Sequence, residues 1–233
     1  MRPYPRLFVI ATVVFWLGST FGGRAEASTI LQTPSALNPG DHFRFVFVTG
    51  GVHDATSTNI TDYDSFVNAQ AGGATYNGAV LSWLAIASTN SLDAIDHIGQ
   101  ATDPLFLSNG TPVADTTTTS GLWSGAIAHA INLDIAANPV SPTFFVWTGT
   151  NPAGTGFGGP LGSLTPQVGS TTDTSGAWVS SGRSPSGDLR NLYGISSTLT
   201  VPQSSVPEPS TLILLVPALF AVGLLRFRGH LLR

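Results

Sequence analysis

The stretch Phe43-Arg44-Phe45-Val46-Phe47-Val48-Thr49 decides the fold. Its phenylalanines occupy every second position, and this period places Phe43, Phe45 and Phe47 on one face of a β-strand. Residues 82–87 and 144–148 are short apolar runs, which predict further buried strands. Residues 177–179 and 193–201 are expected to supply the closing strands. The core of the protein is therefore predicted to be built on a sheet.

Two segments carry helical signals. Thr61 followed three residues later by Asp64 is a capping-box pattern that starts a helix, and apolar residues then recur at helical spacing. Gly72-Gly73 ends this run. A second short helix is predicted over residues 122–131, where apolar side chains again recur at three- and four-residue intervals.

Glycine, asparagine and proline predict where the chain turns. Asn109-Gly110 lies between two apolar segments and predicts a β-hairpin with a type I′ turn, and Pro112 makes the second arm an edge strand. Residues 149–169 are rich in glycine and are expected to be a loop. The order of strand, helix, strands, helix and strands indicates an α+β domain over residues 28–200, compact, with two short helices and long loops.

Composition excludes several kinds of chemistry. The chain has no cysteine, so it has no disulfide and no thiolate nucleophile. Between Ser28 and Ser205 eleven aspartates face three arginines and no lysine, which gives this region a net charge of −8. Such an acidic domain repels phosphate backbones, so nucleic-acid binding is disfavoured.

The N-terminal residues 1–27 have the three parts of a secretory signal peptide in order. Two arginines precede an apolar run over 7–18, and Ala25-Glu26-Ala27 is an A-x-A cleavage pattern. Cleavage there makes Ser28 the first residue of the mature chain. The alternative is an uncleaved anchor helix, which the short apolar run disfavours.

The C-terminal segment predicts a membrane anchor. Residues 201–211 are a linker that contains Pro207-Glu208-Pro209, and residues 212–225 form an apolar stretch that can cross a thin bilayer as a helix. Residues 226–233 are a basic tail in which Arg226 and Arg228 act as a stop, and positive charge stays on the cytoplasmic side. The domain over 28–200 is therefore expected to be extracytoplasmic.

Pro207-Glu208-Pro209, the apolar stretch and the arginine cluster together resemble the PEP-CTERM sorting signal of Gram-negative bacteria. The resemblance implies recognition by exosortase, a membrane protease-transpeptidase that is thought to cut near the Pro-Glu-Pro motif. It also implies export to the cell surface or beyond and an association with exopolysaccharide and biofilm. An ordinary C-terminal anchor is the alternative, with the same topology but no cleavage.

The central domain has a second resemblance. Residues 45–49 and 66–71, then 107–114, 122–125, 146–150 and Trp178, come in the order of an uncharacterised bacterial family of secreted and lipoprotein-type chains. That family is similar to C-type lectins, which implies a C-type-lectin-like fold with a mixed or antiparallel sheet. This chain departs from the pattern in lacking cysteine and the Glu-Pro-Asn and Trp-Asn-Asp elements that hold calcium in sugar-binding lectins. Calcium-dependent sugar binding is not carried over by these residues.

Carboxylates give the candidate metal site and a candidate acid–base pair. Asp62 and Asp64, with Asp54 and Asn59 upstream, have the oxygen ligands that calcium takes, although helix capping also explains them. Asp93 and Asp96, three residues apart, could do acid–base work, but charges at a helix start are commoner.

Two further features have the residue types of a binding site. Trp178 is the tryptophan expected to be exposed and to stack on sugars, because glycine and serine surround it. Residues 154–159 match the G-x-G-x-x-G pattern of dinucleotide sites, but Pro160-Leu161-Gly162 follows and no helix is expected to bind a pyrophosphate.

Three functions remain open on sequence grounds. The first is a non-catalytic, exported surface or matrix protein that binds extracellular polysaccharide, without a cofactor unless calcium is bound. The second is a purely structural or adhesive matrix component. The third is a secreted hydrolase that uses the Asp93 and Asp96 pair.

Overall fold

The phenylalanine-rich stretch forms β2 (His42–Val48), the central strand, and both of its faces are buried. This computed structural model describes residues 28–140 and 145–203. Phe43, Phe45 and Phe47 enter one hydrophobic core, as their alternation predicts. Val46 and Val48 enter a second core on the opposite face, which explains why β2 is apolar at almost every position.

β2 lies inside a mixed sheet with the strand order β10-β9-β8-β11-β2-β6-β7. β11 pairs antiparallel with β2, β6 pairs parallel with it, and β8 pairs parallel with β11. Two further strands pair outside this linear order: β5 pairs with β11, and β12 pairs with β2. The strands are β5 (Trp83–Ala85), β6 (Leu105–Leu107), β7 (Pro112–Ala114), β8 (Phe145–Trp147), β9 (Gln167–Ser170), β10 (Gly182–Arg183), β11 (Asn191–Ser196) and β12 (Leu199–Thr200). The expected strands are thus present, except that Ala177 and Trp178 lie in a 3-10 helix, η1 (Gly176–Trp178), and Val179 is its C-cap.

The predicted hairpin between β6 and β7 is confirmed, and β7 with Pro112 is the last strand of the sheet. The turn type was wrong. Gly110 has a positive φ of 85° but Asn109 does not, whereas a type I′ turn needs two positive values. Gly110 N donates to Leu107 O and Leu107 N to Thr111 O, which is the pattern of a longer loop with glycine in the left-handed position.

A smaller sheet was not predicted. β1 (Ile30–Leu31) pairs parallel with β3 (Thr75–Tyr76), which pairs antiparallel with β4 (Ala79–Val80). Asn77 and Gly78 connect the last two strands with φ values of 49° and 79°. This Asn-Gly pair therefore has the two positive φ values of a type I′ turn, which had been expected at the other pair.

The first helix, α1 (Ile60–Gln70), is present, but its start differs from the prediction. Asn59 is the N-cap, and its side-chain oxygen accepts a hydrogen bond from Thr61 N at 3.2 Å. Asp64 does not cap the helix, because its carboxylate reaches across to Ala85 N and His97. The helix ends at Gln70 with Ala71 as its C-cap, and Gly72 follows with a φ of 57°.

The second helix predicted over 122–131 is wrong. Gly125 has a φ of 88°, which a right-handed helix does not allow. Ile127 N donates to Thr174 O and Ala128 N to Val113 O, so these amides bond to distant segments instead of the preceding turn. The short second helix of the described residues is α2 (Ala94–His97).

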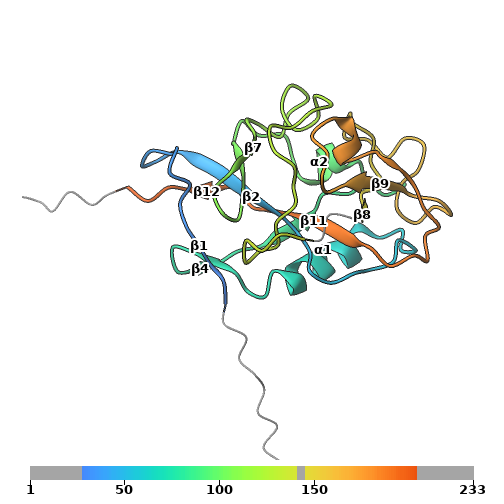
Figure 1. Cartoon of the computed structure of the whole chain (residues 1–233), viewed down its shortest axis with the longest axis horizontal. Coiled ribbons are helices and arrows are strands. Elements are labelled where there is room, and N and C mark those ends of the chain that lie inside the picture. Colours follow the sequence, from blue (N-terminus) through green and yellow to red (C-terminus); the bar gives the residue numbers. More distant parts are fainter. Residues whose placement is uncertain (1–27, 141–144, 204–233) are drawn as a thin grey trace, which may run out of the picture.

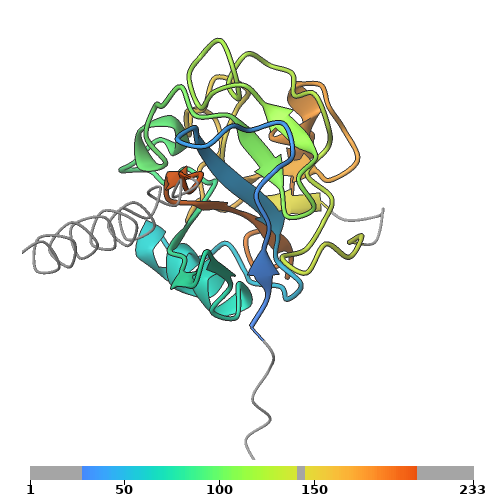
Figure 2. The ribbon, with the colours of Figure 1, turned by 90° about the vertical axis from the view of Figure 1, so that its left-hand side faces the viewer.

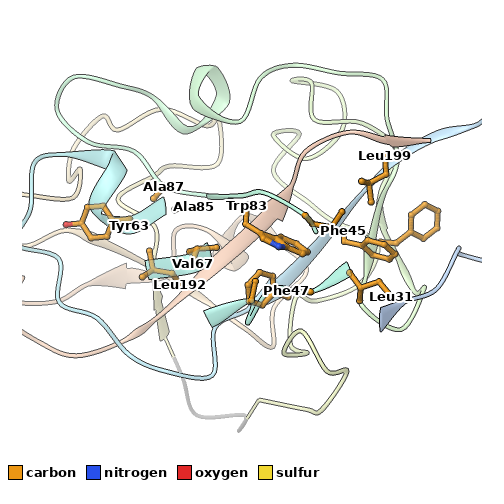
Figure 3. Close-up of a cluster of buried hydrophobic side chains, with 14 of the residues drawn as sticks. Leu31, Phe45, Phe47, Tyr63, Val67, Trp83, Ala85, Ala87, Leu192 and Leu199 are labelled. Atoms are coloured by element: carbon orange, nitrogen blue, oxygen red, sulfur yellow. The ribbon is translucent and has the colours of Figure 1, made fainter. Parts of the chain in front are cut away.

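The sheet separates two hydrophobic cores. The ribbon has α1 on one side of the sheet and long loops with α2 on the other (Figures 1 and 2). Core 1 contains the phenylalanines of β2 together with Trp83 and Val67, and α1 covers it (Figure 3). Core 2 contains Val46, Trp123 and Trp178, and long loops with α2 and η1 cover it. The described residues form a compact α+β domain that is mostly sheet, which confirms the α+β part of the predicted fold class.

Candidate functional site

A pocket of about 370 Å³ opens where the segment before α2 meets the glycine-rich loop. Thr89, Asn90 and Asp93 line it from one side, and residues 155–158 with Pro160 line it from the other. Because Phe157 is its most exposed large side chain, we call it the Phe157 pocket.

Hydrogen bonds between distant segments hold the pocket together. Asp93 Oδ1 accepts from Gly156 N at 2.7 Å, and Ile95 N donates to Gly154 O at 3.0 Å. Asn151 Oδ1 accepts from Ala153 N and Thr155 N, which folds the loop back on itself. These contacts fix the loop on the segment that leads into α2.

Gly154 is required in this arrangement for two reasons. Its φ is 83°, a conformation that other residues rarely adopt. A Cβ there would also lie 2.8 Å from Ile95 and 2.8 Å from the Trp123 ring, both of which belong to core 2. The loop that lines the pocket is therefore packed on core 2.

The pocket presents both apolar and polar groups to solvent. The ring of Phe157 is 86% exposed, although large apolar side chains are usually buried. Asn90 is exposed, and within the described part of the chain its side chain has no hydrogen-bond partner. Asp93 Oδ2 is likewise unpartnered there. An apolar ring beside an amide and a carboxylate suits a ligand with both C–H faces and hydroxyl groups.

Sequence reasoning did not single out Phe157, although it did examine the glycine-rich segment around it. The loop expected over residues 149–169 is confirmed for residues 149–166, which form turns, bends and a single bridge, but it is wrong for residues 167–169, which belong to β9. The signal that could have found Phe157 is an isolated aromatic residue inside a loop of glycine, threonine and proline, where no core position exists for it.

Trp178 was expected to be exposed, and this is wrong. Its side chain is fully buried, its ring lies 5.7 Å from both the Trp123 and the Tyr193 rings, and Tyr193 Oη donates to Trp178 O. The small neighbours allow tight packing instead of exposure, because a Cβ on Gly169 would lie 2.1 Å from Trp178 O. Trp178 in this position cannot stack on a sugar.

Asp62 and Asp64 point to different partners. Asp62 accepts from Ser57 Oγ, while Asp64 Oδ1 accepts from Ala85 N at 2.8 Å and lies 2.9 Å from His97 Nε2. Over residues 28–140 and 145–203 no group of three or more His, Cys, Asp or Glu side chains is arranged to hold a metal ion. Calcium at Asp62 and Asp64 stays a prediction.

Asp54, upstream of that pair, belongs to a local turn. Thr56 N and Thr56 Oγ1 both donate to Asp54 Oδ1. These two hydrogen bonds hold the pKa of the Asp54 carboxyl below its usual value. They therefore explain Asp54 without a bound ion.

The residues expected to direct export lie outside the described residues. They are the cleavage positions Ala25 and Ala27, the motif Pro207-Glu208-Pro209, the apolar stretch 212–225, and Arg226 and Arg228. Ser28, the expected first residue after cleavage, is described and exposed, and its Oγ donates to Gly73 O. None of the helices in the described ranges has the length and apolar character that a membrane span requires.

Comparison with known proteins assigns no family to this chain. No family model matches it, and no curated protein matches it either.

Proposed function

We propose that this chain is an exported, non-catalytic cell-surface or extracellular-matrix protein that binds extracellular polysaccharide in the Phe157 pocket. Exosortase and the export machinery are its partners in sorting. Residues 212–225 hold it in the membrane before processing, after which it resides at the cell surface or outside the cell.

The observation that carries the binding proposal is the 86% exposed ring of Phe157 beside Asn90 and Asp93. A pyranose has an apolar face of C–H groups and a rim of hydroxyls, and carbohydrate sites pair an aromatic platform with amide and carboxylate groups for this reason. The hydrogen bond from Gly156 to Asp93 supports the proposal, because it orders the loop before a ligand arrives.

The sorting signal supports the choice of ligand. Its resemblance to PEP-CTERM signals associates the chain with exopolysaccharide, and a glycan-binding surface domain fits that setting. We propose that the α+β domain has a C-type-lectin-like fold. In such a fold the ligand-binding loops extend from a mixed sheet. In such a domain the Phe157 pocket would replace the absent calcium-binding elements.

The Asp93 and Asp96 pair does not favour a hydrolase. The carboxylate of Asp93 accepts a backbone hydrogen bond from the facing loop, and Asp96 is exposed in the first turn of α2. Asp93 is therefore placed to order the pocket and to accept a sugar hydroxyl, and no catalytic role is proposed for it.

The test is binding of the full-length chain in detergent to exopolysaccharide purified from the producing bacterium. We expect saturable binding, and we expect Phe157→Ala to weaken it about tenfold, which corresponds to about 1.4 kcal/mol. Leu164→Ala is the matched control, because Leu164 is 87% exposed and lies in the same glycine-rich loop but does not line the pocket.

Each outcome has a distinct meaning. Loss of binding with Phe157→Ala but not with Leu164→Ala supports the pocket. Binding that is lost in chelator and insensitive to Phe157→Ala would move the site to a calcium centre, with Asp62 and Asp64 as the residues to replace next. Absence of binding by the unaltered chain would leave a structural matrix component as the better function.

A further inference from the structure

Two of the three arginines in the described ranges are held by contacts within the domain. Arg44 is 4% exposed, and its guanidinium donates to Ser196 O at 2.7 Å and to Ile98 O at 2.8 Å. Burial lowers the pKa of this guanidinium, an effect that the charge of Asp103 partly opposes. Arg190 pairs with Asp188 at 3.0 Å and stacks over the Trp147 ring. Neither side chain is available to a ligand without loss of these contacts.

Arg183 differs from both of them. It is an exposed residue of β10, and within residues 28–140 and 145–203 its guanidinium has no hydrogen-bond or ion-pair partner. The domain has eleven aspartates, yet none of them forms an ion pair with Arg183.

The guanidinium of Arg183 lies beside two glycines of the loop, one of which, Gly158, lines the Phe157 pocket, although Arg183 is not itself a lining residue. Its Nη2 atom is 3.0 Å from the position that a Cβ on Gly158 would occupy, and its Nε atom is 3.5 Å from the corresponding position on Gly159. Gly158 lines the pocket, and its φ of 95° requires glycine there. The absence of side chains at 158 and 159 lets the guanidinium approach the loop backbone.

Two opposite charges therefore lie on or next to the lining of the pocket. Asp93 lines it on the α2 side, and Arg183 lies beside Gly158 and Gly159 on the β10 side. The two side chains do not form an ion pair with each other, so each is open to a ligand. Asp93 can accept hydroxyl donors and repels anions, while the forked guanidinium is suited to a carboxylate or sulfate.

We infer that the Phe157 pocket takes an acidic polysaccharide, with an anionic substituent of the sugar bound by Arg183 and the sugar ring on Phe157. The inference rests on the proposed function and narrows its ligand class. Elsewhere the domain's net charge of −8 works against binding of a polyanion, so specific recognition requires a local cation, and Arg183 supplies it.

The experiment compares polygalacturonate, the same polymer after reduction of its carboxyl groups, and dextran sulfate as ligands of the full-length chain in detergent. We expect polygalacturonate or dextran sulfate to bind about tenfold more tightly than the reduced polymer, and the better of the two identifies the anionic group. Arg183→Ala should remove this preference and leave binding of the reduced polymer unchanged.

Asn109→Asp is the matched control. It changes the net charge by the same amount as Arg183→Ala, and its exposed site follows β6, which lies toward the opposite end of the sheet order from β10. It should leave the preference intact. Circular dichroism of each variant checks that the fold is retained.

The two proposals fail differently. Equal binding of neutral and acidic polymers, unaffected by Arg183→Ala, overturns the role of Arg183 and leaves polysaccharide binding standing. A preference that Asn109→Asp removes as completely as Arg183→Ala also overturns it, because the effect is then one of net charge. Failure to bind any of the three polymers, together with failure on the native exopolysaccharide, overturns both proposals.

Discussion

Core 1 and core 2 lie on opposite faces of the same strand and are closed in different ways. Core 1 is covered by α1, which contributes Tyr63 and Val67 to the cluster that also contains the phenylalanines of β2. Core 2 is covered by loops that bring Trp123 and Trp178 over Val46. The loop-covered core also carries the Phe157 pocket, since Gly154 packs on Trp123. Irregular segments of this domain therefore cover a core and also line the Phe157 pocket.

The largest expected effect tests whether core 2 is as firmly packed as core 1. Trp178→Ala removes a ring that contacts Trp123 and Tyr193, and Trp83→Ala removes one that lies 4.9 Å from Phe47 in core 1. Both residues are buried, so each substitution should lower the free energy of unfolding by about 3–5 kcal/mol. Urea unfolding followed by circular dichroism measures both values.

A small loss of unfolding free energy for Trp178→Ala, together with the full loss for Trp83→Ala, would show that core 2 is less firmly packed than core 1. It would mean that the loops rest on core 2 without stabilising it. Equal losses would instead show that a cover of loops packs as well as a helix.

A smaller effect is expected from Gly194→Ala, which tests the close approach of β11 and α1 in core 1. A Cβ at this position would lie 2.3 Å from Phe47 Cε1 and 2.6 Å from Val67 Cγ1, so both side chains would have to move. We expect a loss of about 1–3 kcal/mol in urea unfolding. Gly187→Ala is the control, because no atom lies within 4 Å of its added Cβ. A loss no larger than that of the control would show that core 1 has room to rearrange.

The parts of the fold that could be predicted have signals within a few residues. The alternation in β2, the apolar spacing in α1 and the Asn109-Gly110 turn each depend on local backbone preferences. The type of that turn was wrong because Asn-Gly adopts more than one loop geometry, and the loop length decides between them.

The parts that could not be predicted depend on contacts between distant segments. Trp178 is buried because β9 and the 126–131 segment close around it, and no pattern near residue 178 reports this. The Phe157 pocket joins Asp93 to Gly156, which are 63 residues apart. The sequence contained each half of the site, but only packing brings the two halves together.

The smallest expected effect concerns Asp64, which links α1, the helix over core 1, to α2, the helix over core 2. Asp64 on α1 accepts from Ala85 N and lies 2.9 Å from His97, which ends α2 on the core 2 side. Asp64→Asn keeps an oxygen for Ala85 N but loses the negative charge beside His97, so we expect a loss of about 1 kcal/mol in urea unfolding. Asp62→Asn, at the exposed contact with Ser57, is the matched control and should stay within about 0.5 kcal/mol of the unaltered chain. If both substitutions prove equally neutral, α1 and α2 are joined by packing alone, and the two cores are more independent than the Asp64 contact implies.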